Sequence, residues 1–204
     1  MPLTVVEESQ TLPVDLTELK SHLRKGGSSP GSYSSEDGVL SLMAKAAGKA
    51  WQQRYKIQLI TATLRWDFSD WKRVMELPRP PFQSVEKVEY MDESGDTQLI
   101  PEADYTTFKF ERMPGRVAFD KDYEFPDLNE MDPYPVKVTY KAGYGLSSDD
   151  VPEDTRLWLM NTIGTFSMQR ESKIISYTGN VSVSEMSKEM AFLLQGAPKA
   201  MRVG

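Results

Sequence analysis

The apolar residues of this chain change their spacing twice, and this change constrains the fold more than any other feature. Between Glu36 and Tyr55 they recur at helical intervals, and the predicted apolar face comprises Val39, Leu42, Met43, Ala46, Ala47, Ala50 and Trp51. From Ile60 to Phe68 they alternate with polar residues, which is typical of a strand with one buried face. Helical spacing returns between Val151 and Ser172. The pattern predicts a β region inserted between two helical parts.

Shorter elements complete this outline. Leucines at helical spacing predict a helix over Val14–Lys25, with Asp15 and Glu18 as a capping pair, and a capping-box pattern at Ser182 opens a last helix. Alternating or apolar runs predict further strands at residues 74–77, 85–91, 97–100, 105–110, 116–119 and 136–140, with a hairpin turn at 92–96. We therefore expect an α+β fold, in which the N- and C-terminal helices form a small bundle and an antiparallel β lobe is inserted. The expected domains are residues 1–56 (helical), 57–146 (β lobe) and 147–204 (helical, packed on the first).

Three prolines precede one predicted strand, in the stretch ELPRPPFQSVEKVEY. Proline fixes its own φ and disfavours helix for the residue before it, so Pro78, Pro80 and Pro81 predict a stiff, extended lead-in. A structural turn between two strands is the favoured interpretation. A proline-rich ligand for a partner domain is the alternative.

Composition excludes several classes of protein. The 204 residues are 39% apolar and include no cysteine, so disulfides, thiol nucleophiles and thiolate metal sites are excluded. No apolar run is long enough for a membrane helix, and the stretch MPLTVVEESQ lacks the basic and apolar regions of a signal peptide. We expect a globular protein that stays where it is made.

The negative charge is concentrated in the β region. The net charge is −6, and residues 84–135 alone contain fourteen Asp or Glu and five Lys or Arg. No basic stripe of the kind that grips nucleic acid is visible. A segment without periodicity, residues 120–135, is expected to be a long, exposed and mobile loop. Its acids form either a solvated surface or one that repels DNA or meets a basic partner: Asp120, Asp122, Glu124, Asp127, Glu130 and Asp132.

Candidate chemistry is sparse. His22 is the only histidine and lies in a leucine-striped helix, so we interpret it as structural. Asp92, Ser94 and Asp96 imitate the start of a calcium loop, but the sixth position is Thr97 where glycine is needed. The stretch AGYG, residues 142–145, lacks the pattern of a phosphate loop. We therefore expect no catalytic residue, metal or cofactor.

A weaker alternative rests on aromatic residues. Trp66, Trp71 and Tyr134 are candidates for stacking on a sugar ring, although the spacing places Trp66 on the apolar face of its strand. A carbohydrate-binding β lobe therefore remains as the second interpretation.

Four separated pieces together resemble one family: VDLTELKSHLR, LPRPPFQSVEKVEY, VKVTYKAGYG, and VPEDTRLWLMNTIG running to QRES. In this order and spacing they are similar to the head-to-tail connector, or adaptor, proteins of long-tailed double-stranded DNA phages and gene-transfer particles. The resemblance covers nearly the whole chain. It departs from the family at the serine-rich loop of residues 26–35, at the acidic segment of residues 120–135, and toward the C-terminus.

The resemblance implies a non-enzymatic virion protein of the neck, assembled in the host cytoplasm. It implies a ring, expected to be a dodecamer, that docks on the portal protein, offers a surface to a downstream neck or tail-completion protein, and extends the channel through which DNA passes without specific binding. Candidate subunit-interface residues are Leu42, Ala46, Ala50, Trp51, Leu157 and Trp158, with packing inside the single chain as the alternative. Candidate portal-binding residues are Met190, Phe192, Leu193, Leu194, Met201 and Arg202, with a fourth core helix as the alternative for their segment. The six acids between Asp120 and Asp132 are the candidate channel surface.

Overall fold

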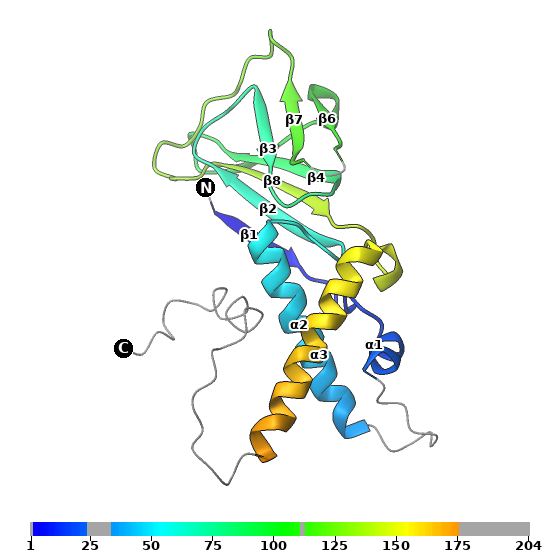
Figure 1. The fold of residues 1–204 in the computed structure, drawn as a ribbon. Coiled ribbons are helices and arrows are strands. Elements are labelled where there is room, and N and C mark those ends of the chain that lie inside the picture. The colour runs from blue at the N-terminus through cyan, green and yellow to red at the C-terminus, as the bar shows by residue number, and fades with distance from the viewer. Residues whose placement is uncertain (1, 24–33, 111–112, 176–204) are drawn as a thin grey trace. The chain divides into compact units, whose positions relative to one another are not determined.

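A computed structural model describes residues 2–23, 34–110 and 113–175 (Figure 1). The chain divides into two compact units. Unit 1 consists of Met1–Gln10 with Lys56–Leu146, and unit 2 consists of Thr11–Tyr55 with Ser147–Gly204. The expected α+β class is confirmed, since the two units separate strands from helices.

Unit 1 is a sandwich of two antiparallel sheets. The five-stranded sheet has the order β1-β2-β8-β4-β5 and the three-stranded sheet has the order β3-β7-β6. The strands are β1 (Leu3–Glu7), β2 (Ala62–Phe68), β3 (Val74–Leu77), β4 (Phe82–Met91), β5 (Thr97–Ile100), β6 (Tyr105–Phe108), β7 (Gly115–Phe119) and β8 (Val136–Ala142). The expected strands and the hairpin at 92–96 are confirmed, with ends that differ by a few residues.

Residues from both sheets fill the core between them. Leu64 and Phe68 of β2, Val138 of β8, and Met75 and Val117 of the smaller sheet are buried in one cluster. The alternation along β2 explains this arrangement, because successive side chains of a strand point to opposite faces. Figure 1 shows the three-stranded sheet lying across the larger one.

β1 was not expected from the sequence. Leu3 pairs with Trp66 and Val5 with Leu64 of β2, and a bulge follows Val5. The N-terminal ten residues therefore belong to the β unit, whereas the expected boundary placed them with the helices.

The proline-rich stretch forms the turn that leads into β4. The carbonyl oxygen of Pro80 accepts the N–H of Gln58 at 2.9 Å, and that of Pro81 accepts the N–H of Gly143 at 2.8 Å. The carbonyl of Pro78 accepts the hydroxyl of Tyr140 at 2.6 Å. The Pro80–Pro81 peptide is cis. The carbonyl oxygens of Pro78, Pro80 and Pro81 thus all accept hydrogen bonds inside unit 1. This confirms the interpretation of the proline-rich stretch as a structural turn.

Unit 2 contains α1 (Leu16–His22), α2 (Ser34–Tyr55) and α3 (Glu153–Ile175). Asp15 caps α1, since its carboxylate accepts the N–H groups of Thr17 and Glu18 at 2.8 and 3.0 Å. The cap was expected, although α1 is shorter than the sequence suggested. The helix expected from Ser182 lies outside the described residues.

Candidate functional site

The facing sides of α2 and α3 meet through aromatic and small residues. The ring of Trp51 lies 4.6 Å from that of Trp158 and 4.3 Å from that of Tyr55. Ala44, Ala47 and Ala50 are buried on the α2 side. Alanine side chains let two helix backbones come close, and the indole pair then fills the space where larger groups fit. Ala50 is therefore buried inside unit 2, and the half-buried Trp51 and Trp158 pack on each other within the single chain.

Three other candidate interface residues are on the surface. Leu42 is 68% exposed and Leu157 is 51% exposed, and Ala46 is exposed as well. The side chains of these three residues expose apolar surface to water, and a second copy of the chain could cover that surface. The candidate portal-binding residues Met190, Phe192, Leu193, Leu194, Met201 and Arg202 lie outside the described residues.

The acidic segment is anchored to unit 1 by its apolar side chains. Tyr123, Phe125 and Leu128 pack against the sandwich core, and the guanidinium of Arg73 donates to the carbonyl oxygen of Tyr123 at 2.7 Å. The N–H of Asn129 donates to the carbonyl oxygen of Met91 at 3.0 Å. Residues 120–135, which we expected to be a mobile loop, are therefore packed against unit 1. The residues that anchor them are irregularly spaced, so the sequence showed no periodic pattern there.

The acids of this segment point away from those anchors. Five of the six candidates are exposed: Asp120, Asp122, Glu124, Asp127 and Glu130. Asp132 is half-buried instead. Its carboxylate lies 3.6 Å from the ammonium of Lys137 and accepts the N–H of Tyr134 at 2.8 Å. The anchored backbone thus presents several carboxylates to solvent.

Trp71 is already engaged within unit 1. The ring of Phe125 stacks on it at 5.2 Å with an interplanar angle of 16°, and its indole N–H donates to the carbonyl of Pro126 at 3.0 Å. Tyr90 and Phe119 contact it at 5.6 and 5.9 Å. A sugar-binding tryptophan needs an open face. Trp71 therefore gives no support to the carbohydrate-binding interpretation.

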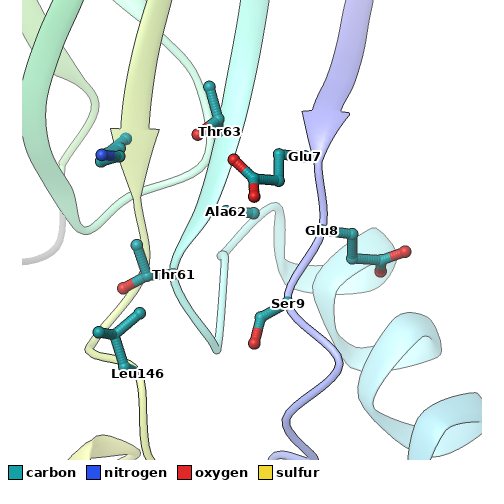
Figure 2. Close-up of a pocket in the computed structure, with 8 residues that line it drawn as sticks. Glu7, Glu8, Ser9, Thr61, Ala62, Thr63 and Leu146 are labelled. Atoms are coloured by element: carbon teal, nitrogen blue, oxygen red, sulfur yellow. The ribbon is translucent and has the colours of Figure 1, made fainter.

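Two glutamates line a pocket of about 280 Å³ at the end of β1, together with Ser9, Thr61, Ala62, Thr63, Lys141 and Leu146. Figure 2 shows the carboxylates of Glu7 and Glu8 pointing in different directions. The ammonium of Lys141 lies 2.9 Å from Glu86, and that hydrogen bond raises the pKa of Lys141. A carboxylate pair that shares a proton or flanks a bond must converge on it. This pair does not.

Other ionisable groups have structural partners. The ring of His22 lies 3.1 Å from the amide oxygen of Asn161, on the surface of unit 2. Asp92 closes the β4–β5 hairpin, and hydrogen bonds from Gln98 and from the backbone lower its pKa. Over residues 2–23, 34–110 and 113–175, no group of three or more acidic or histidine side chains is placed to hold a metal ion. Within the same residues, no helix is long and apolar enough to cross a membrane.

Exposed apolar residues on the edge strands were not among the candidates. Val74 is 48% exposed on β3, Leu99 is 63% exposed on β5, and Phe108 is 46% exposed on β6. The sequence does indicate the exposure of Val74 and Leu99, because each is followed directly by another apolar residue, Met75 or Ile100. Two adjacent apolar residues in a strand point to opposite faces, so one of them leaves the core.

No protein-family model matches the chain, and no curated protein sequence matches it. Solved structures share its fold. One is from the neck of an empty GTA particle computed with C6 symmetry, with a TM-score of 0.71, 20% identity, and coverage of 96% of this chain and 95% of that chain. A second is from the virion of a native gene transfer agent (GTA) particle, with a TM-score of 0.68, 19% identity, and coverage of 96% and 94%. A third is from the neck of a native GTA particle computed with C12 symmetry, with a TM-score of 0.62, 20% identity, and coverage of 96% and 94%.

Proposed function

We propose that this chain is a structural protein of the neck of a phage or gene-transfer particle, where copies of it form a ring. The observation that carries the proposal is a fold shared over 96% of the chain with proteins from such necks, two of them in maps computed with cyclic symmetry. The sequence resemblance to head-to-tail connectors points the same way. A cyclic ring needs two different complementary faces on each subunit.

The proposed ring sits under the portal and provides the docking surface for the next neck or tail component. Leu42, Ala46 and Leu157 are proposed to contact a neighbouring copy, because they leave apolar surface exposed on unit 2. The C-terminal segment with Met190, Phe192, Leu193, Leu194, Met201 and Arg202 is the proposed portal contact. The function is one of assembly, without a reaction or a cofactor.

The anchored acidic segment is the proposed lining of the DNA passage. Exposed carboxylates repel phosphates and do not retain them, so DNA slides past with little friction. The anchoring supports this role, since Tyr123 and Phe125 fix the backbone that carries the acids.

The test is assembly. Mass photometry of the purified protein, alone and mixed with the portal protein of the same particle, is expected to show a ring mass, and electron microscopy of the mixture is expected to show rings on the portal. A protein that stays monomeric in both conditions and leaves the portal bare contradicts the proposal. A change of tryptophan fluorescence on adding glycans, with no ring, would favour the carbohydrate-binding alternative.

A further inference from the structure

An apolar pocket of about 410 Å³ opens beside β3, at one edge of the three-stranded sheet. Its walls are mostly aromatic, aliphatic and proline side chains: Trp66, Phe68, Val74, Pro78 and Pro114, with Lys72 and Glu76 at the charged positions. A pocket of this composition and size suits one bulky apolar side chain.

A bulky apolar side chain occupies the other edge of the same sheet. Phe108 of β6 is 46% exposed. The register places it in one row with the pocket, because Phe108 pairs with Arg116 of β7 and Arg116 pairs with Glu76 of β3. The aromatic ring and the pocket therefore stand at the same level along the strands, at opposite edges.

The strand directions make the two edges compatible with each other. β3 is antiparallel to β7, and β7 is antiparallel to β6, so β3 and β6 run in the same direction. A second copy displaced sideways keeps this direction, and its β3 edge then meets the β6 edge of the first copy at the same height. An edge that met its own copy would need a two-fold axis instead.

We propose that Phe108 of one copy inserts into the pocket of Trp66, Phe68, Val74, Pro78 and Pro114 of the next copy, so that neighbouring three-stranded sheets are joined edge to edge around the ring. This inference rests on the proposed function. A contact between two unlike edges repeats from copy to copy, and it closes on itself only when the copies form a ring. One side chain and a four-residue strand bury less area than a stable pair needs, so the contact acts together with others in a closed ring.

Cysteine pairing tests the contact directly, because the chain contains no cysteine. We expect the Phe108→Cys and Glu76→Cys variants to form disulfide-linked dimers when they are mixed under oxidising conditions that permit assembly, and neither variant to do so alone, because Glu76 is the pocket residue at the level of Phe108. The two positions cannot pair within one chain. β7 separates them, and two strand spacings, about 9.5 Å, exceed the roughly 7 Å between Cα atoms that a disulfide spans. Leu99→Cys mixed with Glu76→Cys is the control pair and is expected to remain unlinked.

A charge variant provides a second measurement. For Phe108→Asp, we expect the protein concentration required for ring assembly to rise at least about tenfold. The reason is that the phenyl group, which is half-exposed in the single copy, would no longer be buried at the contact. Leu99→Asp is the matched control, since it makes the same kind of change at an exposed residue of the other sheet, and is expected to assemble as the wild type does. Circular dichroism confirms that both variants remain folded.

The outcomes separate this contact from the proposed function. Rings without Phe108–Glu76 linkage, and with equal assembly of Phe108→Asp and Leu99→Asp, overturn the contact and leave the ring in place. Linkage of Phe108→Cys to itself as strong as in the mixture overturns it as well, since the edges would then be alike. Absence of rings under every condition defeats the proposed function and, with it, this contact, whereas rings that form without the linkage defeat the contact alone.

Discussion

Replacing Tyr140 with phenylalanine isolates one hydrogen bond that holds the proline turn. The Tyr140 side chain is fully buried, and its hydroxyl donates to the carbonyl oxygen of Pro78 at 2.6 Å. Phenylalanine keeps the ring, which packs 6.3 Å from that of Phe82, and removes only the donor. The substitution therefore leaves a carbonyl without its partner at the entrance to β4.

The expected cost at pH 7 is about 1–3 kcal/mol in the free energy of unfolding, the range for a buried polar group that loses its partner. Two other carbonyls of the turn keep their bonds, to Gln58 and Gly143. The turn is thus expected to stay in place, and the cost to come from the single acceptor.

The same hydroxyl predicts a pH dependence. Burial raises the pKa of Tyr140, and the nearby charge of Arg79 lowers it by a smaller amount. In the unfolded chain a tyrosine ionises near pH 10. Above that pH the unfolded state has lost a proton that the folded state keeps, so stability falls as pH rises, by about 1.4 kcal/mol per pH unit. The contribution is fully present below pH 10.

Urea unfolding followed by tryptophan fluorescence, at intervals from pH 7 to pH 11, measures both effects. We expect wild type to be more stable than Tyr140→Phe up to about pH 10, and the difference to shrink above it. Tyr105 and Tyr123, whose pKa values burial also raises, are present in both proteins and cancel. Tyr134→Phe is the control and should match wild type. A difference between wild type and Tyr140→Phe that stays constant across this range would refute the reasoning.

Three further outcomes are expected. Leu42→Glu should change the free energy of unfolding by less than about 0.5 kcal/mol, because the side chain is 68% exposed, yet reduce the ring fraction in mass photometry; an unchanged ring fraction counts against its place in the interface. Glu124→Lys with Asp127→Lys should slow DNA ejection from assembled particles, and normal assembly with unchanged ejection would reject the lining role. Gly143→Ala should destabilise the fold by at least about 1–3 kcal/mol in thermal or urea unfolding, since φ is +136° and the added methyl would lie 2.5 Å from the backbone of Thr61; near-wild-type stability would show that the turn relaxes.

The strands were predictable where one face of a strand is buried. β3 and β5 have the expected ends, because Met75, Leu77 and Ile100 are buried beside exposed neighbours. β1 was not predictable in this way. It is an edge strand with Val5 and Val6 both exposed, so its residues show no buried face for a pattern to reveal.

The helix face of α2 was predicted only in part. Ala47 and Ala50 of the expected face are buried, whereas Leu42 and Ala46 are exposed, and the buried Leu40 and Ala44 were not among the expected residues. Alanines lie all around this helix, and a methyl group is too small to mark the side that packs. The candidate interface consequently mixed a buried residue, Ala50, with half-buried and exposed ones.

The acidic segment shows what periodicity cannot detect. Its anchors Tyr123, Phe125 and Leu128 are held by ring contacts and backbone hydrogen bonds without a regular repeat. The composition revealed the acids, but only tertiary contacts fix where they point. The same limit applies to the pocket beside β3, which joins residues from β2, β3 and the turn before β7.

The division of the chain into two discontinuous units has a consequence for its synthesis. Unit 2 begins with α1 and α2 and is completed only when α3 has been made, after all of residues 56–146. At ribosomal speeds of about 5–20 residues per second, α2 waits roughly 5–20 seconds for its partner helix. The sandwich of unit 1 has all of its strands only at the end of this interval, when β8 has been made. During this interval the indole of Trp51 lacks Trp158, its partner on α3, whereas Ala44 and Ala47 expose only methyl groups, so Trp51 is the larger apolar group that an unfinished bundle presents on the ribosome.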